Sequence, residues 1–236
     1  MLYQLNFSKI LFLDIETVPM TAAYRDLPDR FRKLWDKKAE YLRRSEEDTP
    51  DKLFSRAGIY AEFGKIICIS VGFAYNQEFR MKSFYGDDEK ILLQEFAEML
   101  TRYFPSGEYL LCAHNGKEFD FPYIARRMLI NRIPLPDILN IAGKKPWEVA
   151  HLDTMELWKF GDYKSYTSLD LLTAVFGLET PKEDIDGSMV ATVYYKEKDL
   201  ERIVEYCQRD TLAVAQLLRA YLGLDPIKED DVVIKS

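Results

Sequence analysis

A run of apolar residues that leads directly into acidic residues places the strongest constraint on the fold of this chain. Residues 10–13, Ile-Leu-Phe-Leu, are consecutive apolar residues, and Asp14 follows them. Apolar residues that do not alternate with polar ones are typical of a strand buried on both faces of its sheet. We therefore expect residues 9–14 to form an internal strand that ends where the acids begin.

The rest of the chain contains segments with the apolar spacing of further strands and helices. Residues 65–75 and 79–85 are β-branched and aromatic, and the short connection at 76–78 predicts a hairpin. Strands that later alternate with helices favour an α/β domain, with a mixed five-stranded sheet flanked by helices. The predicted strands are 9–14, 65–75, 79–85, 109–114 and 151–157, and the predicted helices are 89–104, 121–131, 168–176 and 198–222.

The length and composition indicate one globular domain. The chain has 236 residues, of which 47% are hydrophobic, and we expect a single domain over 1–224 followed by a frayed tail at 225–236. The net charge of −7 argues against an architectural nucleic-acid binder coated in positive charge. It is compatible with a nucleic-acid enzyme that gathers carboxylates around divalent cations.

The cysteines and the termini bear on the cellular compartment. Cys68, Cys112 and Cys207 lie in apolar runs without Cys-x-x-Cys spacing, which predicts buried, reduced thiols. No apolar run is long enough to cross a membrane, and the N-terminus lacks the charged-then-apolar order of a signal peptide. We therefore expect a cytoplasmic protein with no membrane partner.

Residues 25–56 form a highly charged segment between the first two predicted strands. Of these 32 residues, 10 are positive and 8 are negative. Apolar residues recur within the segment at helical spacing, which predicts an amphipathic helical insertion. Such an insertion either packs on the domain or over its site, or is a solvated helix that only covers a sheet edge. The recurring apolar residues are Leu27, Phe31, Leu34, Trp35 and Leu42.

The first cluster of chemically useful residues follows the first strand. Asp14 and Glu16 are two residues apart, so their carboxylates point to the same face while the chain stays extended. This geometry suits two carboxylates that share a cation. Alternatively, the acids only mark the point where the chain reaches solvent.

The second cluster lies where the predicted strand 109–114 gives way to a helix. Asp120 stands there, after Asn115, which offers a hydrogen bond, and Phe119, which offers a stacking ring. The carboxyl ends of strands in α/β sheets are where ligands gather. The alternative is that Asp120 is only the N-cap of the helix.

The third cluster lies in the predicted C-terminal helix. Tyr206 and Asp210 are four residues apart, so they lie on one face of the helix beside an apolar seam. An acid beside an apolar seam is costly to bury unless it is paired. The alternative to a metal ligand is a salt bridge from Asp210 to an arginine: Arg126, Arg127 or Arg209.

Taken together, the clusters predict a metal site. Asp14, Glu16, Asp120 and Asp210 each have a context that lets them converge on one edge of the sheet, and four carboxylates do not share a site without cations. Oxygen ligands select hard ions, so we expect two divalent cations, Mg²⁺ or Mn²⁺. Two such ions suit in-line displacement at phosphorus.

The three clusters occur as longer motifs in a fixed order: FLDIET at 12–17, HNGKEFDFPY at 114–123 and YCQRDTLAVAQLL at 206–218. They resemble the exonuclease motifs of the DEDD superfamily, in its tyrosine-bearing branch, and most closely the proofreading exonuclease domain of family B DNA polymerases. In the histidine-bearing branch, a His lies five residues before the last Asp. Here that position is Glu205, and Tyr206 follows it. Because about 14 residues follow the last predicted helix, we expect a free-standing member of the family.

The resemblance implies a ribonuclease H-like fold and a role for each motif residue. Asp14 would contact both cations, and Asp120 would bind the second one through water. Tyr206 would orient the attacking water, because a phenol with a pKa of about 10 stays protonated at neutral pH. The implied metal ligands are Asp14, Glu16, Asp120 and Asp210, the implied catalytic residues are these four and Tyr206, and the implied substrate contacts are Thr17, Asn115 and Phe119.

The activity implied by the resemblance is 3′–5′ exonucleolytic hydrolysis of terminal phosphodiesters in single-stranded nucleic acid, with DNA favoured and RNA as the alternative. The partner would be a single-stranded 3′ end, and any replication or repair partner is unknown. A catalytically silent nucleic-acid binding module of the same fold is a further alternative. A DNA or RNA end-binding subunit is another, and it depends on the charged segment 25–56.

Overall fold

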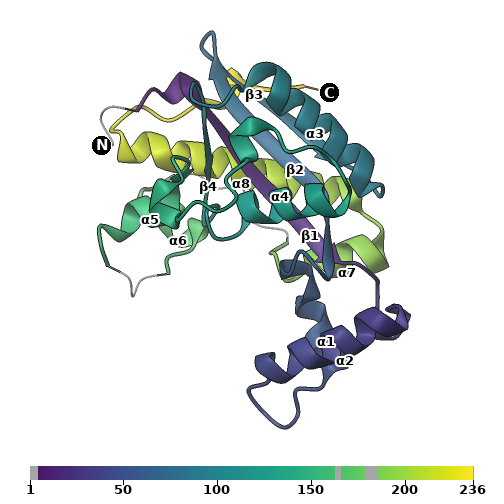
Figure 1. Cartoon of the computed structure of the whole chain (residues 1–236). Helices are drawn as coiled ribbons and strands as arrows, with labels where there is room; N and C mark the ends of the chain where they lie inside the picture. The colour runs from purple at the N-terminus through teal and green to yellow at the C-terminus, as the bar shows by residue number, and fades with distance from the viewer. Residues whose placement is uncertain (1–4, 163–165, 179–184, 236) are drawn as a thin grey trace.

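The computed structural model describes residues 5–162, 166–178 and 185–235. Its centre is a mixed sheet with strand order β5-β4-β1-β2-β3-β6 (Figure 1). β1 pairs antiparallel with β2 and parallel with β4, and β2 continues antiparallel into β3. The strands are β1 (Ile10–Pro19), β2 (Gly64–Tyr75), β3 (Glu78–Tyr85), β4 (Leu110–Ala113), β5 (Leu152–Asp153) and β6 (Val232–Lys235).

Helices cover both faces of this sheet, which confirms the expected α/β architecture. In Figure 1, α3 and α4 lie in front of the sheet and α8 crosses behind it. None of the helices in the described ranges is long and apolar enough to span a membrane. The helices are α1 (Asp29–Leu42), α2 (Pro50–Leu53), α3 (Glu89–Tyr103), α4 (Asp120–Ile130), α5 (Thr154–Lys159), α6 (Leu169–Val175), α7 (Val190–Thr192) and α8 (Leu200–Tyr221).

β1 is buried on both faces, as its apolar run predicts. Leu11 and Leu13 pack into the core formed with α3 and α4, whereas Ile10 and Phe12 pack into the core formed with α8. Successive side chains of a strand point to opposite faces. Asp14 and Glu16 share the parity of Ile10 and Phe12, so the strand directs them towards α8.

The prediction that β1 ends at the acids is wrong. β1 continues to Pro19 because β2 pairs with it as far as Pro19 and Gly64, with a register shift between Glu16 and Thr17. On its other side, the pairing with β4 ends at Phe12. The acids therefore lie inside a strand, at the point where one of its two neighbours stops.

The predicted strand at 151–157 is also wrong beyond its first residues. β5 contains only Leu152 and Asp153, and α5 begins at Thr154. The chain turns there because the Asp153 carboxylate accepts hydrogen bonds from the backbone N–H groups of Met155 (3.0 Å) and Glu156 (3.2 Å).

The sheet has six strands rather than the expected five. The sixth is β6, in the tail that we expected to be frayed, and it pairs parallel with β3 from Phe79 to Lys82. Val232 packs against the core that β3 forms with α8. Pairing with β3 and this contact hold the tail in a strand. The mixed charges of the tail had given no pattern from which a strand could be predicted.

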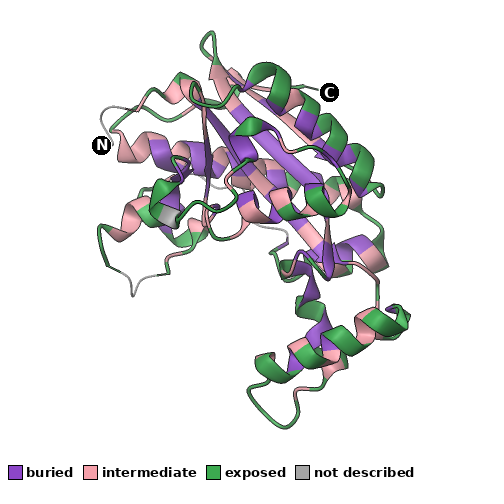
Figure 2. Ribbon diagram, in the orientation of Figure 1, coloured by how far each residue is buried: buried purple, intermediate pink, exposed green. Residues whose placement is uncertain are grey.

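The charged segment is a helical insertion with an apolar core of its own. α1 buries Trp35 and Ala39, and the Trp35 indole donates a hydrogen bond to the carbonyl of Pro50 at 2.8 Å. Phe54 and Phe63 make edge contacts with the Trp35 ring. The insertion projects from the end of β1 and β2 (Figure 1), and Figure 2 shows α1 exposed along its outer side. Because the edge strands are β5 and β6, the insertion covers neither edge of the sheet.

Candidate active site

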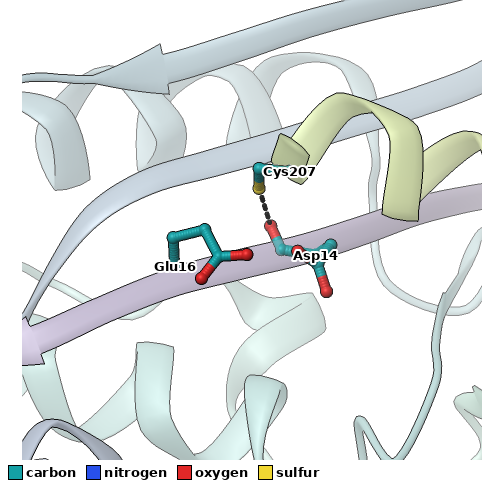
Figure 3. A group of neighbouring side chains, drawn as sticks. All are labelled: Asp14, Glu16 and Cys207. Atoms are coloured by element: carbon teal, nitrogen blue, oxygen red, sulfur yellow. Dashed lines mark hydrogen bonds between the residues drawn. The ribbon is translucent and has the colours of Figure 1, made fainter. Parts of the chain in front are cut away.

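Asp14 and Glu16 lie side by side on the face of β1 that α8 covers. One carboxylate oxygen from each residue and the Cys207 sulfur of α8 all lie within 4.8 Å of one another (Figure 3). Glu16 is 7% exposed, and Asp14 is half-buried. The parity of the strand therefore brings both carboxylates to one place beneath a helix.

Asp120 is the buried first residue of α4. It is 3% exposed, and Phe119 occupies the N-cap position, so the N-cap interpretation of Asp120 is wrong. The backbone N–H of Ile15 on β1 donates a hydrogen bond to the Asp120 carboxylate. The start of α4 is thus fastened to the residue between Asp14 and Glu16.

Tyr206 and Asp210 approach the same acids from α8. The Tyr206 hydroxyl forms a hydrogen bond with the Asp210 carboxylate, one helical turn away. Burial, followed by the negative charges of Asp210, Glu16 and Asp14, raises the pKa of this phenol. Tyr206 therefore remains protonated at neutral pH.

Burial and mutual repulsion perturb the whole acid cluster. Burial is the largest cause of the raised pKa of Asp14, followed by the charges of Glu16, Asp210 and Asp120. Burial also raises the pKa of Glu16, followed by the charge of Asp210. The same cause raises the pKa of Asp120 to about 8. Cations between these groups would offset both the burial and the repulsion.

One atom of the cluster has the environment that a metal ligand needs. The Oδ2 atom of Asp14 is buried and has no hydrogen-bond partner. A buried, unpartnered carboxylate oxygen is costly unless something else binds it. The residues present therefore fit a hard divalent cation, because every acidic ligand atom in the cluster is a carboxylate oxygen.

Cys207 packs in the site but adds no negative charge to it. Its thiol donates a hydrogen bond to the backbone carbonyl of Asp14 at 3.3 Å (Figure 3). Burial raises the pKa of the thiol well above its usual range. A protonated thiol is a poor ligand for the cations that carboxylates prefer. Cys68 and Cys112 are likewise buried and free, as expected.

Two of the three expected substrate-contact residues adjoin the acids in the chain, since Thr17 follows Glu16 and Phe119 precedes Asp120. Thr17 and Phe119 both contact Tyr123 of α4, Thr17 by a side-chain hydrogen bond and Phe119 at a ring-centroid distance of 5.3 Å. Asn115 adopts a left-handed backbone conformation (φ 62°), and its side-chain Oδ1 is buried without a hydrogen-bond partner. Asn115 is thus the member of this set with an unsatisfied polar atom.

Sequence reasoning missed the residue that organises this part of the site. Asp153 is 2% exposed and accepts hydrogen bonds from the N–H groups of Asn115 (3.0 Å) and Lys117 (3.1 Å), in addition to capping α5. Its charge is also the largest acidic contribution to the raised pKa of Asp120. A signal was present, because Glu156 follows Asp153 by three residues, which is the spacing of a helix-capping pair.

Comparisons with known proteins bear on the fold that carries this site. A model described as RNase H superfamily matches residues 56–222, which is 167 of the 236 residues. The match begins after β1, the strand that carries Asp14 and Glu16.

Among solved structures, the chain is similar to a family B DNA polymerase from the hyperthermophilic archaeon Pyrobaculum calidifontis, with a TM-score of 0.53 and 15% sequence identity. The similarity covers 91% of this chain but only 24% of the polymerase. At this identity it concerns the fold.

Proposed function

The chain belongs to the RNase H superfamily, in agreement with the ribonuclease H-like fold expected from its motifs, and on that premise we propose that it is a metal-dependent nuclease acting on single-stranded nucleic acid. The observation that carries the proposal is the pair of carboxylates of Asp14 and Glu16 beneath α8, with the buried Asp14 Oδ2 left unpartnered. Asp120 and Asp210 are near enough for their charges to raise the pKa of Asp14. A binding module has no evident use for an acid cluster that lowers its own stability.

The proposed ligands are the acids that meet on β1, α4 and α8. Asp14, Glu16 and Asp210 would hold one divalent cation, Mg²⁺ or Mn²⁺, and Asp14 and Asp120 would serve the second. Such cations lower the pKa of bound water and neutralise the charge that builds up on a phosphate under attack. Asp153 keeps the loop before Asp120 in place through its bonds to Asn115 and Lys117.

Tyr206 is proposed to position the attacking water. Its hydroxyl is protonated and already hydrogen-bonded to Asp210. It would therefore hold the water by a hydrogen bond rather than remove a proton from it. A positioned hydrogen bond of this kind contributes most in the transition state.

We further propose that cleavage is exonucleolytic and proceeds from the 3′ end, releasing nucleoside 5′-monophosphates, with DNA favoured over RNA. The support is the order of the three motifs and the similarity of fold to a family B DNA polymerase. Phe119 and Asn115, which precede Asp120 in the chain, are suited to stacking and hydrogen bonding with the terminal nucleotide.

The test is digestion of single-stranded DNA and RNA of matched sequence, labelled at the 5′ end, with Mg²⁺, Mn²⁺ or EDTA. We expect a ladder that shortens from the 3′ end, with DNA degraded faster and no cleavage in EDTA. Asp14→Ala should retain less than about one percent of the rate, because it removes the ligand shared by both cations.

Three outcomes would overturn parts of this proposal. Degradation of a 3′-blocked strand as fast as an unblocked one, or cleavage of a circular strand, would exclude the exonuclease assignment. Faster degradation of RNA would identify an exoribonuclease. Binding of both strands without metal-dependent cleavage would identify the silent binding module.

A further inference from the structure

Helix α1 of the insertion carries three exposed cations on one side. Arg30, Lys33 and Lys37 follow i, i+3 and i+7 spacing, so they lie on one side of the helix. The acids of α1, at positions 29, 36 and 40, border this side, since each lies three or four residues from Lys33 or Lys37. The buried side, with Trp35 and Ala39, faces the core of the insertion. Arg30, Lys33 and Lys37 therefore share an exposed side of α1 that has acids along one border.

Two exposed side chains with apolar surface lie on the same side of α1 as these cations. Leu34 and Tyr41 follow at i+4 and i+11 from Arg30, and they are 46% and 88% exposed. We call the set Arg30, Lys33, Leu34, Lys37 and Tyr41 the basic flank. An exposed tyrosine one helical turn after a lysine combines a surface for stacking with charges for phosphates.

The cations of the basic flank are not used inside the protein. Within the described part of the chain, no ion pair or cation–ring contact involves Arg30, Lys33 or Lys37, and all three are exposed. Two of the neighbouring acids are engaged elsewhere, since Asp29 pairs with Arg32 and Asp36 accepts a hydrogen bond from the Tyr24 hydroxyl at 2.5 Å. The packing of the insertion therefore does not account for the basic flank.

The base of the insertion joins β1 and α4, two of the three elements that carry the acid cluster. Directly after β1, the backbone N–H of Met20 donates to the carbonyl of Phe63 at 2.8 Å, and Phe63 packs on Trp35. On the α4 side, the Tyr123 hydroxyl donates to Gly58 at 2.7 Å, and Arg127 donates to Ala61 at 2.7 Å. Asp120 lies one helical turn before Tyr123 in α4. The base of the insertion is thus bonded to the helix that carries Asp120.

We propose that the basic flank binds single-stranded DNA, contacting nucleotides of the substrate strand beyond those held at the acid cluster. This inference rests on the proposed nuclease function. Each phosphate is an anion, so it is complementary to these cations. The whole chain has a net charge of −7 and offers a poor general surface for phosphates. Tyr41 and Leu34 would cover the faces of unpaired bases.

The length of the basic flank sets the length of strand that it engages. Arg30 and Tyr41 are 11 residues apart, which is about 16 Å along a helix. A stacked strand rises about 3.4 Å per nucleotide, so the flank matches about five nucleotides. A dinucleotide covers less than half of this length, so it cannot fill the flank.

Binding is measured first, in EDTA so that the strand is not hydrolysed, with fluorescein-labelled oligothymidylate of about 20 nucleotides over a series of salt concentrations. The test variant is Lys33→Gln/Lys37→Gln. Loss of two phosphate contacts should weaken binding about 10- to 30-fold at 0.1 M salt and reduce the salt slope by about 1.4. Tyr41→Ala should weaken binding about 5- to 100-fold with the slope unchanged.

The matched control removes two exposed cations from another helix. Lys90→Gln/Arg102→Gln on α3 changes the net charge equally, and Tyr103→Ala removes a neighbouring tyrosine that is 55% exposed. These variants should bind the oligonucleotide as the unchanged protein does. Equal weakening by the test and control pairs would show a general charge effect and overturn the proposal, as would unchanged affinity in the test pair.

Hydrolysis then separates this inference from the proposed function. The basic-flank variants should cleave a dinucleotide at the normal rate and the long strand with a kcat/KM reduced about as much as the affinity. If the unchanged protein binds the long strand through the flank but cleaves nothing, the nuclease proposal fails and the inference stands. If the protein cleaves but the flank variants bind normally, only the inference fails.

Discussion

Replacing Asp120 tests whether the acid cluster destabilises the metal-free protein. Burial raises the pKa of Asp120 from 3.8 to about 8, and the charges of Asp153 and Asp210 add to the rise. The folded protein therefore keeps a proton that the unfolded chain loses above about pH 4. The resulting contribution to stability is fully present below pH 4 and is lost as the pH rises towards 8, which is the opposite of an ordinary paired carboxylate.

The size of this effect follows from the two pKa values. They differ by about 4, and each unit corresponds to 1.36 kcal/mol, so the loss from this one group has a ceiling of about 5 kcal/mol. An asparagine has no charge to develop, and its side-chain oxygen can still accept the N–H of Ile15. The free energy of unfolding of the unchanged protein should fall as the pH rises from about 4.5 to 8. In Asp120→Asn we expect this fall to be smaller by about 2–5 kcal/mol.

The assay is urea unfolding in EDTA at several pH values across that range. Glu98→Gln, which removes an exposed acid of α3, serves as the control and should follow the unchanged protein. Adding Mg²⁺ at pH 8 should stabilise the unchanged protein more than Asp120→Asn, because a cation that binds only the folded state adds to its stability. If Asp120→Asn loses as much stability as the unchanged protein between about pH 4.5 and pH 8 in EDTA, the reasoning is refuted.

Three further substitutions test other parts of the site and its support. Tyr206→Phe should lower kcat about ten- to a thousandfold with little change in KM, as expected for one transition-state hydrogen bond, and steady-state kinetics with unchanged turnover would remove Tyr206 from the mechanism. Asp153→Ala should cost about 2–4 kcal/mol in urea unfolding because it leaves buried N–H groups unpaired. A cost under about 1 kcal/mol would contradict that role. Glu89→Gln should cost about 3 kcal/mol by weakening a buried pair with Arg127, equally with and without Mg²⁺; a metal-dependent cost would contradict a purely structural pair.

The order of strands and helices could be predicted where local patterns and tertiary packing agree. The hairpin between β2 and β3 is one case, since Asn76 and Gln77 adopt the positive φ values that a two-residue turn requires. α8 is another, because Asp199 caps it and its apolar seam faces the sheet. In both places each local preference points to the structure that the core also favours.

The parts that could not be predicted depend on pairings between distant residues. The length of β1 beyond Asp14 is set by β2, which begins 50 residues later at Gly64. The convergence of the acids was expected, yet the bond from Ile15 that fastens Asp120 to β1 is a tertiary contact without a sequence signal. The role of Asp153 had such a signal, but the apolar residues around it favoured a strand.

The sixth strand also affects how the protein behaves in concentrated solution. An exposed strand edge is a row of unpaired N–H and C=O groups that can template pairing with another chain. β6 covers β3 from Phe79 to Lys82, and at the opposite edge β5 is only two residues long. A chain shortened before Val232 would keep every residue of the acid cluster but present the edge of β3 to its neighbours. Self-association, rather than lost chemistry, would be the first consequence of trimming that end.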